Sequence, residues 1–291
     1  MNYSELKKSA QLNQAFSLSP DLDVFVHHFP GSPLLPGALS ALLLAETFGG
    51  TNWTLKKING FRLRKPLLPN APISIDCTSQ QETETQISCS GKIFNGSDTF
   101  ADGEFIFEKS KLPVANGSST EPTELTWTGA KIREYLPHGE PIVLIDLLAS
   151  AIYPQEILDL LAGPNTADLD QTKLVGTKVH TRSKLKAGNF WLNQGTLPSP
   201  VLSELVAQAA ALTLAPFFTG TKPQVSLLGC DTEYFALAGE GSTIDTFVEL
   251  TRAKRLGQSS NMMIFKSECR IGDIKIASVN LNAMATFEKA V

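Results

Sequence analysis

A duplicated proline–glycine loop, followed each time by an apolar helical segment, constrains the fold of this 291-residue chain more than any other feature. The first copy begins at residue 28 and the second at residue 190, 162 positions later. In the first copy, Pro36-Gly37 opens a segment that is apolar on nearly every side, a pattern typical of a buried helix. In the second, Pro200 opens the corresponding helix and Pro216 ends it. The duplication predicts two similar structural units.

The segments after each helix alternate in hydropathy and are separated by turn signals, which predicts an antiparallel meander in both halves. Asn95-Gly96 is a strong hairpin signal, and Ile271-Gly272-Asp273 occupies the corresponding turn of the second half. The expected strands cover residues 58–63, 73–78, 86–94 and 100–108, then 225–230, 243–252, 262–270 and 275–287. We therefore expect an α+β fold of two antiparallel sheets, each wrapped around a long buried central helix.

The boundary between the halves is predicted from composition. Residues 110–125 are rich in Ser, Thr, Pro and Gly and lack an apolar period, which indicates a linker between a first unit at 1–109 and a second at 126–291. The second unit has a leading segment, residues 132–146, with no equivalent in the first. The opening strand of the first unit is therefore expected to be missing or supplied differently.

Bulk composition excludes several classes of function. A net charge of −4 without a long basic run argues against nucleic-acid binding. The four cysteines show no CxxC pairing, so we expect reduced, mostly buried thiols and neither a metal site nor a disulfide framework. The N-terminal residues lack the apolar stretch of a secretory signal, and the longest apolar run, 38–45, is too short to cross a bilayer. A cytoplasmic location without a cofactor is the expectation.

Each copy of the motif has kept a different half of a possible acid–base pair. Fourteen positions after His28 stands Leu42, whereas fourteen positions after Phe190 stands Glu204. One copy thus has a histidine without an acid, and the other has an acid without a histidine.

Four segments carry a resemblance to a known family. They are the His-Phe-Pro-Gly loop ending in Pro-Gly at 28–37, the Glu-x-x-x-Gln pattern at 204–208, the Leu-Pro-His segment within 135–146, and residues 57–69. The chain resembles the β-hydroxyacyl-acyl-carrier-protein dehydratases, which have the hotdog fold, over nearly its whole length outside the linker. In that family the active site lies at a dimer interface, with histidine from one subunit and the acidic residue from the other.

The resemblance implies a fused double hotdog with one composite site made by His28 and Glu204, in which Leu42 and Phe190 mark an abandoned second site. Its implied reaction is dehydration of a 3-hydroxyacyl thioester to the trans-2-enoyl thioester. The implied partner is an acyl-carrier protein, or coenzyme A as the thioester, and a homo-oligomer of the fused unit is left open. Acyl chain length and pathway are not predicted.

Dehydration needs a base for the α proton and an acid for the departing hydroxyl. His28 suits the first role, and Glu204, on an apolar stretch of helix, suits the second because burial favours its protonated form. Gly37 opens a helix whose N-terminal N–H groups could stabilise the developing enolate. Gln208, one turn after Glu204, is expected to orient that acid or to contact substrate.

Plainer interpretations compete with each assignment. His28 could be a loop histidine with a local hydrogen bond, and His27 is the nearer competitor for the catalytic role. His138 is expected to shape a turn and His180 to lie on a strand surface. Glu204 and Gln208 could be polar residues on an exposed helical stripe.

Alternatives also remain for the function as a whole. A hotdog thioesterase would not require His28, whereas a non-catalytic acyl-binding partner subunit would not hydrate an enoyl thioester. An acidic carrier would need a basic surface near the cavity mouth, for which Arg62, Arg64 and Lys65 are candidates. The competing interpretation of these three residues is a solvated strand edge.

Overall fold

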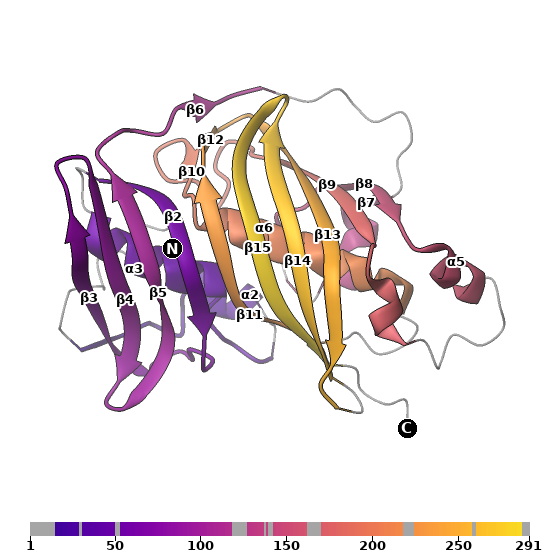
Figure 1. The fold of residues 1–291 in the computed structure, drawn as a ribbon, viewed down its shortest axis with the longest axis horizontal. Helices are drawn as coiled ribbons and strands as arrows, with labels where there is room; N and C mark the ends of the chain where they lie inside the picture. The colour runs from indigo at the N-terminus through magenta and orange to yellow at the C-terminus, as the bar shows by residue number, and fades with distance from the viewer. Residues whose placement is uncertain are drawn as a thin grey trace.

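The structure is a computed structural model that describes residues 15–28, 31–49, 53–117, 127–136, 138, 142–161, 170–217, 224–257 and 260–286. It shows a long, twisted antiparallel sheet with its main helices on one face (Figure 1). Several predicted features lie outside these residues. They are residues 29–30 of the first loop motif, 137 and 139–141 of the Leu-Pro-His segment, 118–125 of the linker, and residue 287 of the last strand.

The first unit contains every strand predicted for it, each one longer than expected because the pairing extends into the turns. Its elements are β1 (Phe16–Ser17), α2 (Asp23–His27), α3 (Gly37–Gly49), β2 (Thr54–Leu63), β3 (Pro72–Glu82), β4 (Gln86–Asn95) and β5 (Asp98–Glu108). The Asn95-Gly96 hairpin forms as predicted, with Asn95 opposite Asp98 and Gly96 at φ 56°.

The second unit repeats the helix and meander and adds strands and short helices before them. Its elements are β7 (Trp127–Thr128), α4 (Gly129–Tyr135), β8 (Leu147–Ile152), α5 (Gln155–Leu161), η1 (Gln171–Leu174), β9 (Lys178–Lys184), β10 (Thr196–Leu197), α6 (Val201–Ala211), η2 (Leu212–Phe217), β11 (Gln224–Tyr234), β12 (Leu237–Gly239), β13 (Thr243–Arg255), β14 (Ser260–Ile271) and β15 (Ile274–Thr286). Pro216 does not end the α-helix directly, because the chain passes through the 3₁₀-helix η2.

The antiparallel sheets expected for the two units are joined edge to edge into one continuous sheet. The strand order is β1-β3-β4-β5-β2-β11-β15-β14-β13-β9-β8-β7, and the two units meet where β2 pairs antiparallel with β11. This pairing gives hydrogen-bond partners to backbone groups of two strands that would otherwise be unpaired sheet edges. The approach is close at Gly229, where a Cβ atom would collide with the Phe61 carbonyl oxygen, so the junction needs glycine.

The two predicted central helices, α3 and α6, lie behind the sheet in Figure 1 and contact each other. Helix α3 packs on β2, β3, β4 and β5, whereas α6 packs on strands of the second unit. Ten of the eleven residues of α6 are buried, so this helix has almost no face left for solvent. The contact between the helices brings the two motif copies to the middle of the molecule.

The predicted linker contributes to the fold. Val114–Ala115 forms β6, which pairs in parallel with β12 and completes a small sheet in the order β10-β12-β6. In the first unit, the short strand β1 pairs with β3 at the sheet edge in place of a longer opening strand. No helix in the part of the chain that the structure describes is long and apolar enough to span a membrane.

Candidate active site

Helix α2 and the following loop position His28. His28 caps the helix, and its backbone N–H donates to the carbonyl of Val24 at 3.0 Å, while Val24 and Phe25 are buried. The ring is also buried, and Nδ1 lies 3.2 Å from the carbonyl oxygen of Leu34. Because a carbonyl can only accept, Nδ1 carries the proton and the lone pair resides on Nε2. His28 does make the local hydrogen bond that the alternative interpretation expected. That bond uses Nδ1, so Nε2 is the nitrogen that can accept a proton.

Helix α6 carries Glu204 into the interior. The side chain of Glu204 is only 4% exposed, and its helix neighbours Leu205 and Val206 are buried, so the interpretation as an exposed polar stripe is wrong. Burial raises the pKa of Glu204 to about 7, and the hydrogen bond from Gln208 opposes this rise. Glu204 can therefore carry a proton near neutral pH.

His28 and Glu204 lie together although 176 positions separate them in sequence. Nε2 of His28 is 4.0 Å from Oε1 of Glu204, and both residues border one cavity of about 410 Å³. The walls of this cavity come from both units, namely from the start of α3, residues 63–68, α6 and β11. A gap of 4.0 Å admits no substrate between the two groups, so a substrate would lie across both from the cavity side.

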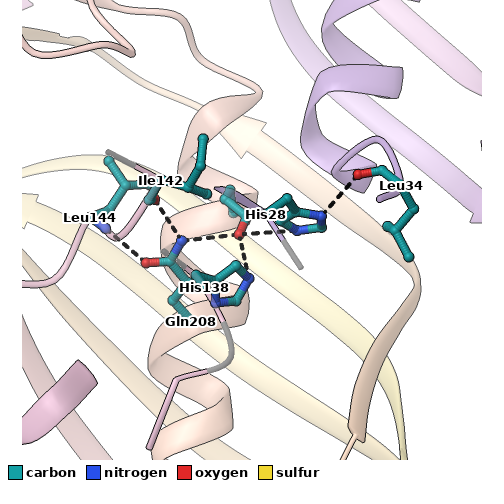
Figure 2. Close-up of polar contacts among 7 residues, drawn as sticks. His28, Leu34, His138, Ile142, Leu144 and Gln208 are labelled. Atoms are coloured by element: carbon teal, nitrogen blue, oxygen red, sulfur yellow. Dashed lines mark hydrogen bonds and ion pairs between the residues drawn. The ribbon is translucent and has the colours of Figure 1, made fainter. Parts of the chain in front are cut away.

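A second histidine enters the site, which the sequence analysis assigned only to a turn. Nε2 of His138 is 3.4 Å from Oε1 of Glu204, and its ring centroid is 5.0 Å from that of His28. His138 also borders the cavity, and Figure 2 shows its ring near Gln208. The available signal was its place in the Leu-Pro-His segment, but spacing alone could not show that this segment folds onto α6.

Gln208 ties that segment to the acid. Its amide N–H groups donate to Oε1 of Glu204 and to the carbonyl of Ile142, both at 3.1 Å, and its oxygen accepts from the backbone N–H of Leu144 at 2.8 Å. Gln208 is fully buried, and Figure 2 shows its contacts with Ile142 and Leu144. Its amide is occupied by protein groups, so the geometry supports the orienting role over the substrate-binding role.

Both histidines of the site favour the neutral form. Burial, and then the nearby His138, lower the pKa of His28 to about 3, although the Leu34 carbonyl opposes the shift. Burial lowers the pKa of His138 to about 4. Neutral imidazoles beside a carboxyl group that titrates near pH 7 form an acid–base set that works at neutral pH. His27 lies outside the cavity lining, so the structure favours His28 over this competitor.

Gly37 begins α3 and borders the cavity. A Cβ at this position would collide with the Leu63 side chain and approach Cδ2 of Leu227 to 2.8 Å, so the ends of these two side chains would have to shift. The first N–H groups of a helix have no partner within that helix, and here the helix begins at the cavity wall. The geometry agrees with a role for this terminus in stabilising negative charge.

The three basic candidates differ in position. Arg64 and Lys65 are exposed and border the cavity, whereas Arg62 is exposed on β2 outside its lining. Arg64 pairs with Asp102, with Nη2 3.0 Å from Oδ2, and Lys65 Nζ lies 2.6 Å from Oδ1 of Asp98. Their charges are thus partly compensated within the protein.

The equivalent place formed by the other motif copies lacks the pair. Leu42 is buried, and Phe190 packs edge-on against Trp191 with ring centroids 5.2 Å apart. A cavity of about 200 Å³ borders Leu42, with half-buried Glu46 as a neighbour. Neither Leu42 nor Phe190 can carry a proton.

His28, His138 and Glu204 are also a group that could hold a metal ion, because each offers one ligand atom and these atoms lie within 4.8 Å of one another. Two histidines and one glutamate form a donor set that zinc accepts. The same lone pairs serve as proton acceptors, so a metal and acid–base chemistry would compete for them.

Comparisons with known proteins agree with this fold. Residues 4–104 match the family described as ApeI-like, the ApeI dehydratases. The chain is similar in structure to a putative thioesterase II from Thermobifida fusca YX, with 9% identity, coverage of 99% of this chain and 98% of the other, and a TM-score of 0.59.

Two dehydratases are similar as well. A putative MaoC domain protein dehydratase from Chloroflexus aurantiacus J-10-fl has 9% identity, coverage of 95% and 94%, and a TM-score of 0.56. The dehydratase domain of RzxB from Pseudomonas fluorescens has 11% identity, coverage of 94% and 93%, and a TM-score of 0.55. No curated protein matches the chain in sequence. The chain is therefore a hotdog-fold protein whose first unit is similar to the ApeI dehydratases.

Proposed function

We propose that this protein dehydrates 3-hydroxyacyl thioesters to trans-2-enoyl thioesters at a single composite site. The observation that carries the proposal is the pairing of His28 from the first unit with Glu204 from the second, 4.0 Å apart at the wall of one cavity. The base and the acid of this reaction act on adjacent carbons, so both groups must reach the same small region of substrate.

The reaction divides between the two side chains. Nε2 of His28 removes a proton from the carbon next to the thioester carbonyl, and the freed electron pair forms the new carbon–carbon double bond. The bond from the neighbouring carbon to its hydroxyl breaks, and the Glu204 proton completes the departing water. The site is left with protonated His28 and ionised Glu204, and a proton passing from the first to the second restores it.

The thioester oxygen becomes more negative as the proton leaves, and the start of α3 is the proposed stabiliser. Backbone N–H groups at a helix N-terminus, together with the helix dipole, favour negative charge there. Gly37 permits this close approach because any side chain would enter the space of Leu63 and Leu227.

The proposed carrier is an acyl-carrier protein that docks beside Arg64 and Lys65 at the cavity. A carrier-bound substrate presents its acyl group on a long flexible arm, and an acidic carrier is attracted to basic residues at the entrance. Beyond Glu204 the cavity is bordered by Ala207, Ala210 and Ala211, whose small side chains leave room for an apolar acyl chain along α6.

A thioesterase is the second candidate because one similar structure is a putative thioesterase. In that mechanism a carboxylate on the central helix would activate water. The pKa of Glu204, raised to about 7 by burial, disfavours this role because part of the population is protonated at neutral pH. The adjacent neutral His28 has a clear task in dehydration and none that is required in hydrolysis.

The decisive experiment measures the hydration of a trans-2-enoyl thioester, the reverse reaction, by the loss of enoyl absorbance. Purified protein is supplied with the coenzyme A form and with the acyl-carrier form, and free thiol release is followed in parallel. We expect hydration with little thiol release. Thiol release that exceeds hydration would replace the dehydratase by a thioesterase, and neither activity would support a non-catalytic subunit.

A further inference from the structure

Gln208, which contacts the acid, also contacts two residues that follow His138 in the chain. Gln208 bonds to Ile142 and Leu144, which follow His138 in the chain, and to Glu204 on its own helix. Leu136, two residues before His138, is buried. Figure 2 shows Gln208 with Ile142 and Leu144, and His138 near them.

One oxygen of Glu204, Oε1, lies close to nitrogen atoms of both Gln208 and His138. Oε1 accepts an N–H from Gln208 at 3.1 Å, and Nε2 of His138 lies 3.4 Å from the same oxygen. An oxygen that accepts from an amide is the carbonyl-type oxygen of a carboxylic acid, so the acid proton belongs on Oε2. A second N–H on Oε1 would strengthen this assignment and would stabilise the carboxylate after the proton has left.

We propose that His138 is a positioning residue that donates its Nε2 proton to Oε1 of Glu204, so that Oε2 delivers the acid proton to the substrate and the resulting carboxylate is stabilised. This inference rests on the proposed dehydratase function. The distance of 3.4 Å is long for a hydrogen bond, but catalytic hydrogen bonds often tighten only when substrate is bound.

The pH dependence of activity tests the proposal, and it involves every group that faces Glu204. They are His28 at the end of α2, His138 after α4 and Gln208 on α6, and Arg64 and Lys65 border the same cavity from the loop after β2. The site works in either direction only while one proton is shared between His28 and Glu204. Activity is therefore lost as pH rises through the pKa of Glu204, and removing a donor from the carboxylate must move that loss to higher pH.

The experiment compares His138→Gln with His138→Met, which are similar in size and differ in the N–H donor. For enoyl thioester hydration, we expect His138→Gln to remain within a fewfold of wild type. We expect His138→Met to lose roughly ten- to a hundredfold in kcat with little change in KM, the effect of one hydrogen bond to a charged group. The basic limb of its pH profile should move upward by about one pH unit.

A purely structural role would lower activity in both variants and leave the pH limb in place, which would overturn the inference. Equal and unchanged activity in both would overturn it as well. Titration of the Glu204 carboxyl by NMR, assigned with Glu204→Gln, tests the same shift without turnover, and an unchanged pKa in His138→Met would be decisive against the proposal. An inactive wild type would instead refute the dehydratase function itself.

Discussion

At His28 one backbone contact selects the tautomer with the proton on Nδ1, and burial keeps the ring neutral. The Leu34 carbonyl accepts a hydrogen bond from Nδ1–H, and burial lowers the pKa of the ring to about 3. At Glu204 burial works in the opposite chemical direction and raises the pKa to about 7. The same physical cause thus keeps a base unprotonated and an acid protonated.

Removing either group is expected to remove most of the activity. His28→Ala and Glu204→Gln should each lower kcat for enoyl thioester hydration by on the order of 10²–10⁴, the usual range for a lost general acid or base. His180→Gln is the matched control, because His180 lies on β9 beside Asp245 and glutamine keeps a donor for that carboxylate. Full activity in either site variant would exclude the composite site.

Burial of Glu204 should also appear in the pH dependence of stability. Its folded pKa, about 7, exceeds the ordinary value of 4.5, so the unfolded chain releases this proton first and folding loses free energy as pH rises from about 4.5 to 7. At about 1.36 kcal/mol per pKa unit, the loss is on the order of 3 kcal/mol.

Glu204→Gln removes this titration. Its Tm relative to wild type should therefore be higher at pH 8 than at pH 4. Because the difference is taken at each pH, the shared effects of the two buried histidines cancel. A constant difference in Tm across this range would show that Glu204 titrates normally.

Zinc ions are expected to inhibit the proposed hydration by occupying His28 and Glu204 together with the neighbouring His138. His28, His138 and Glu204 lie close enough to share one ion, and the contact of Nδ1 of His28 with a backbone carbonyl is typical of metal-bound histidines. Micromolar Zn²⁺ should reduce hydration reversibly, with recovery on chelation. His138→Gln should need at least about tenfold more zinc, and an unchanged sensitivity would place the inhibitory ion elsewhere.

At the scale of elements, α3 and α6 would each supply one part of the proposed reaction near their contact. Helix α6 provides the acid with its orienting glutamine one turn later, and α3 provides its N-terminus. Both helices are held between the sheet and each other, which suits groups that must keep fixed positions.

Gly37→Ala tests the packing at the start of α3. The added methyl group collides with Leu63 and approaches Leu227, so we expect a loss of roughly 1–3 kcal/mol in unfolding free energy together with lower kcat. Gly257→Ala is the control, because a Cβ there meets no atom within 4 Å. Denaturant unfolding and hydration kinetics measure the two effects, and a fully active Gly37→Ala protein would remove the helix start from the proposed mechanism.

At the scale of the whole molecule, the cavity opens between the two units beside a small basic surface. Arg64→Glu combined with Lys65→Glu should raise KM for the carrier-bound substrate severalfold and leave kcat largely unchanged. The lost ion pairs with Asp102 and Asp98 are exposed and contribute little to stability. KM for a small thioester should change little.

The control for this charge reversal is the pair Arg252→Glu and Lys254→Glu. Both residues are exposed on β13 and lie outside the cavity lining. If the control raises KM for the carrier equally, attraction is nonspecific. If the small thioester suffers as much as the carrier, Arg64 and Lys65 serve the structure and do not dock a carrier.

The sequence by itself determined the central helices, most strands and the pairing of His28 with Glu204. Helices and strands follow from local periodicity, and the hairpin at Asn95-Gly96 follows from a residue that tolerates positive φ. The pairing of His28 with Glu204 was expected from the two motif copies, one with the histidine and one with the acid, together with the two-subunit site of the family that the chain resembles. All of these signals lie within short segments of chain.

Only the tertiary structure decided which strands join the two sheets, the place of His138 and the partners of Arg64 and Lys65. The sheet junction depends on a backbone contact between Gly229 and Phe61. His138 lies 3.4 Å from Glu204 on α6, and Gln208 of the same helix bonds to Ile142, which follows His138 in the chain. These arrangements join residues far apart in sequence, and their free energy comes from burial and pairing that exist only after the chain has folded. Local sequence patterns do not encode contacts between distant residues, so only the folded structure shows these contacts.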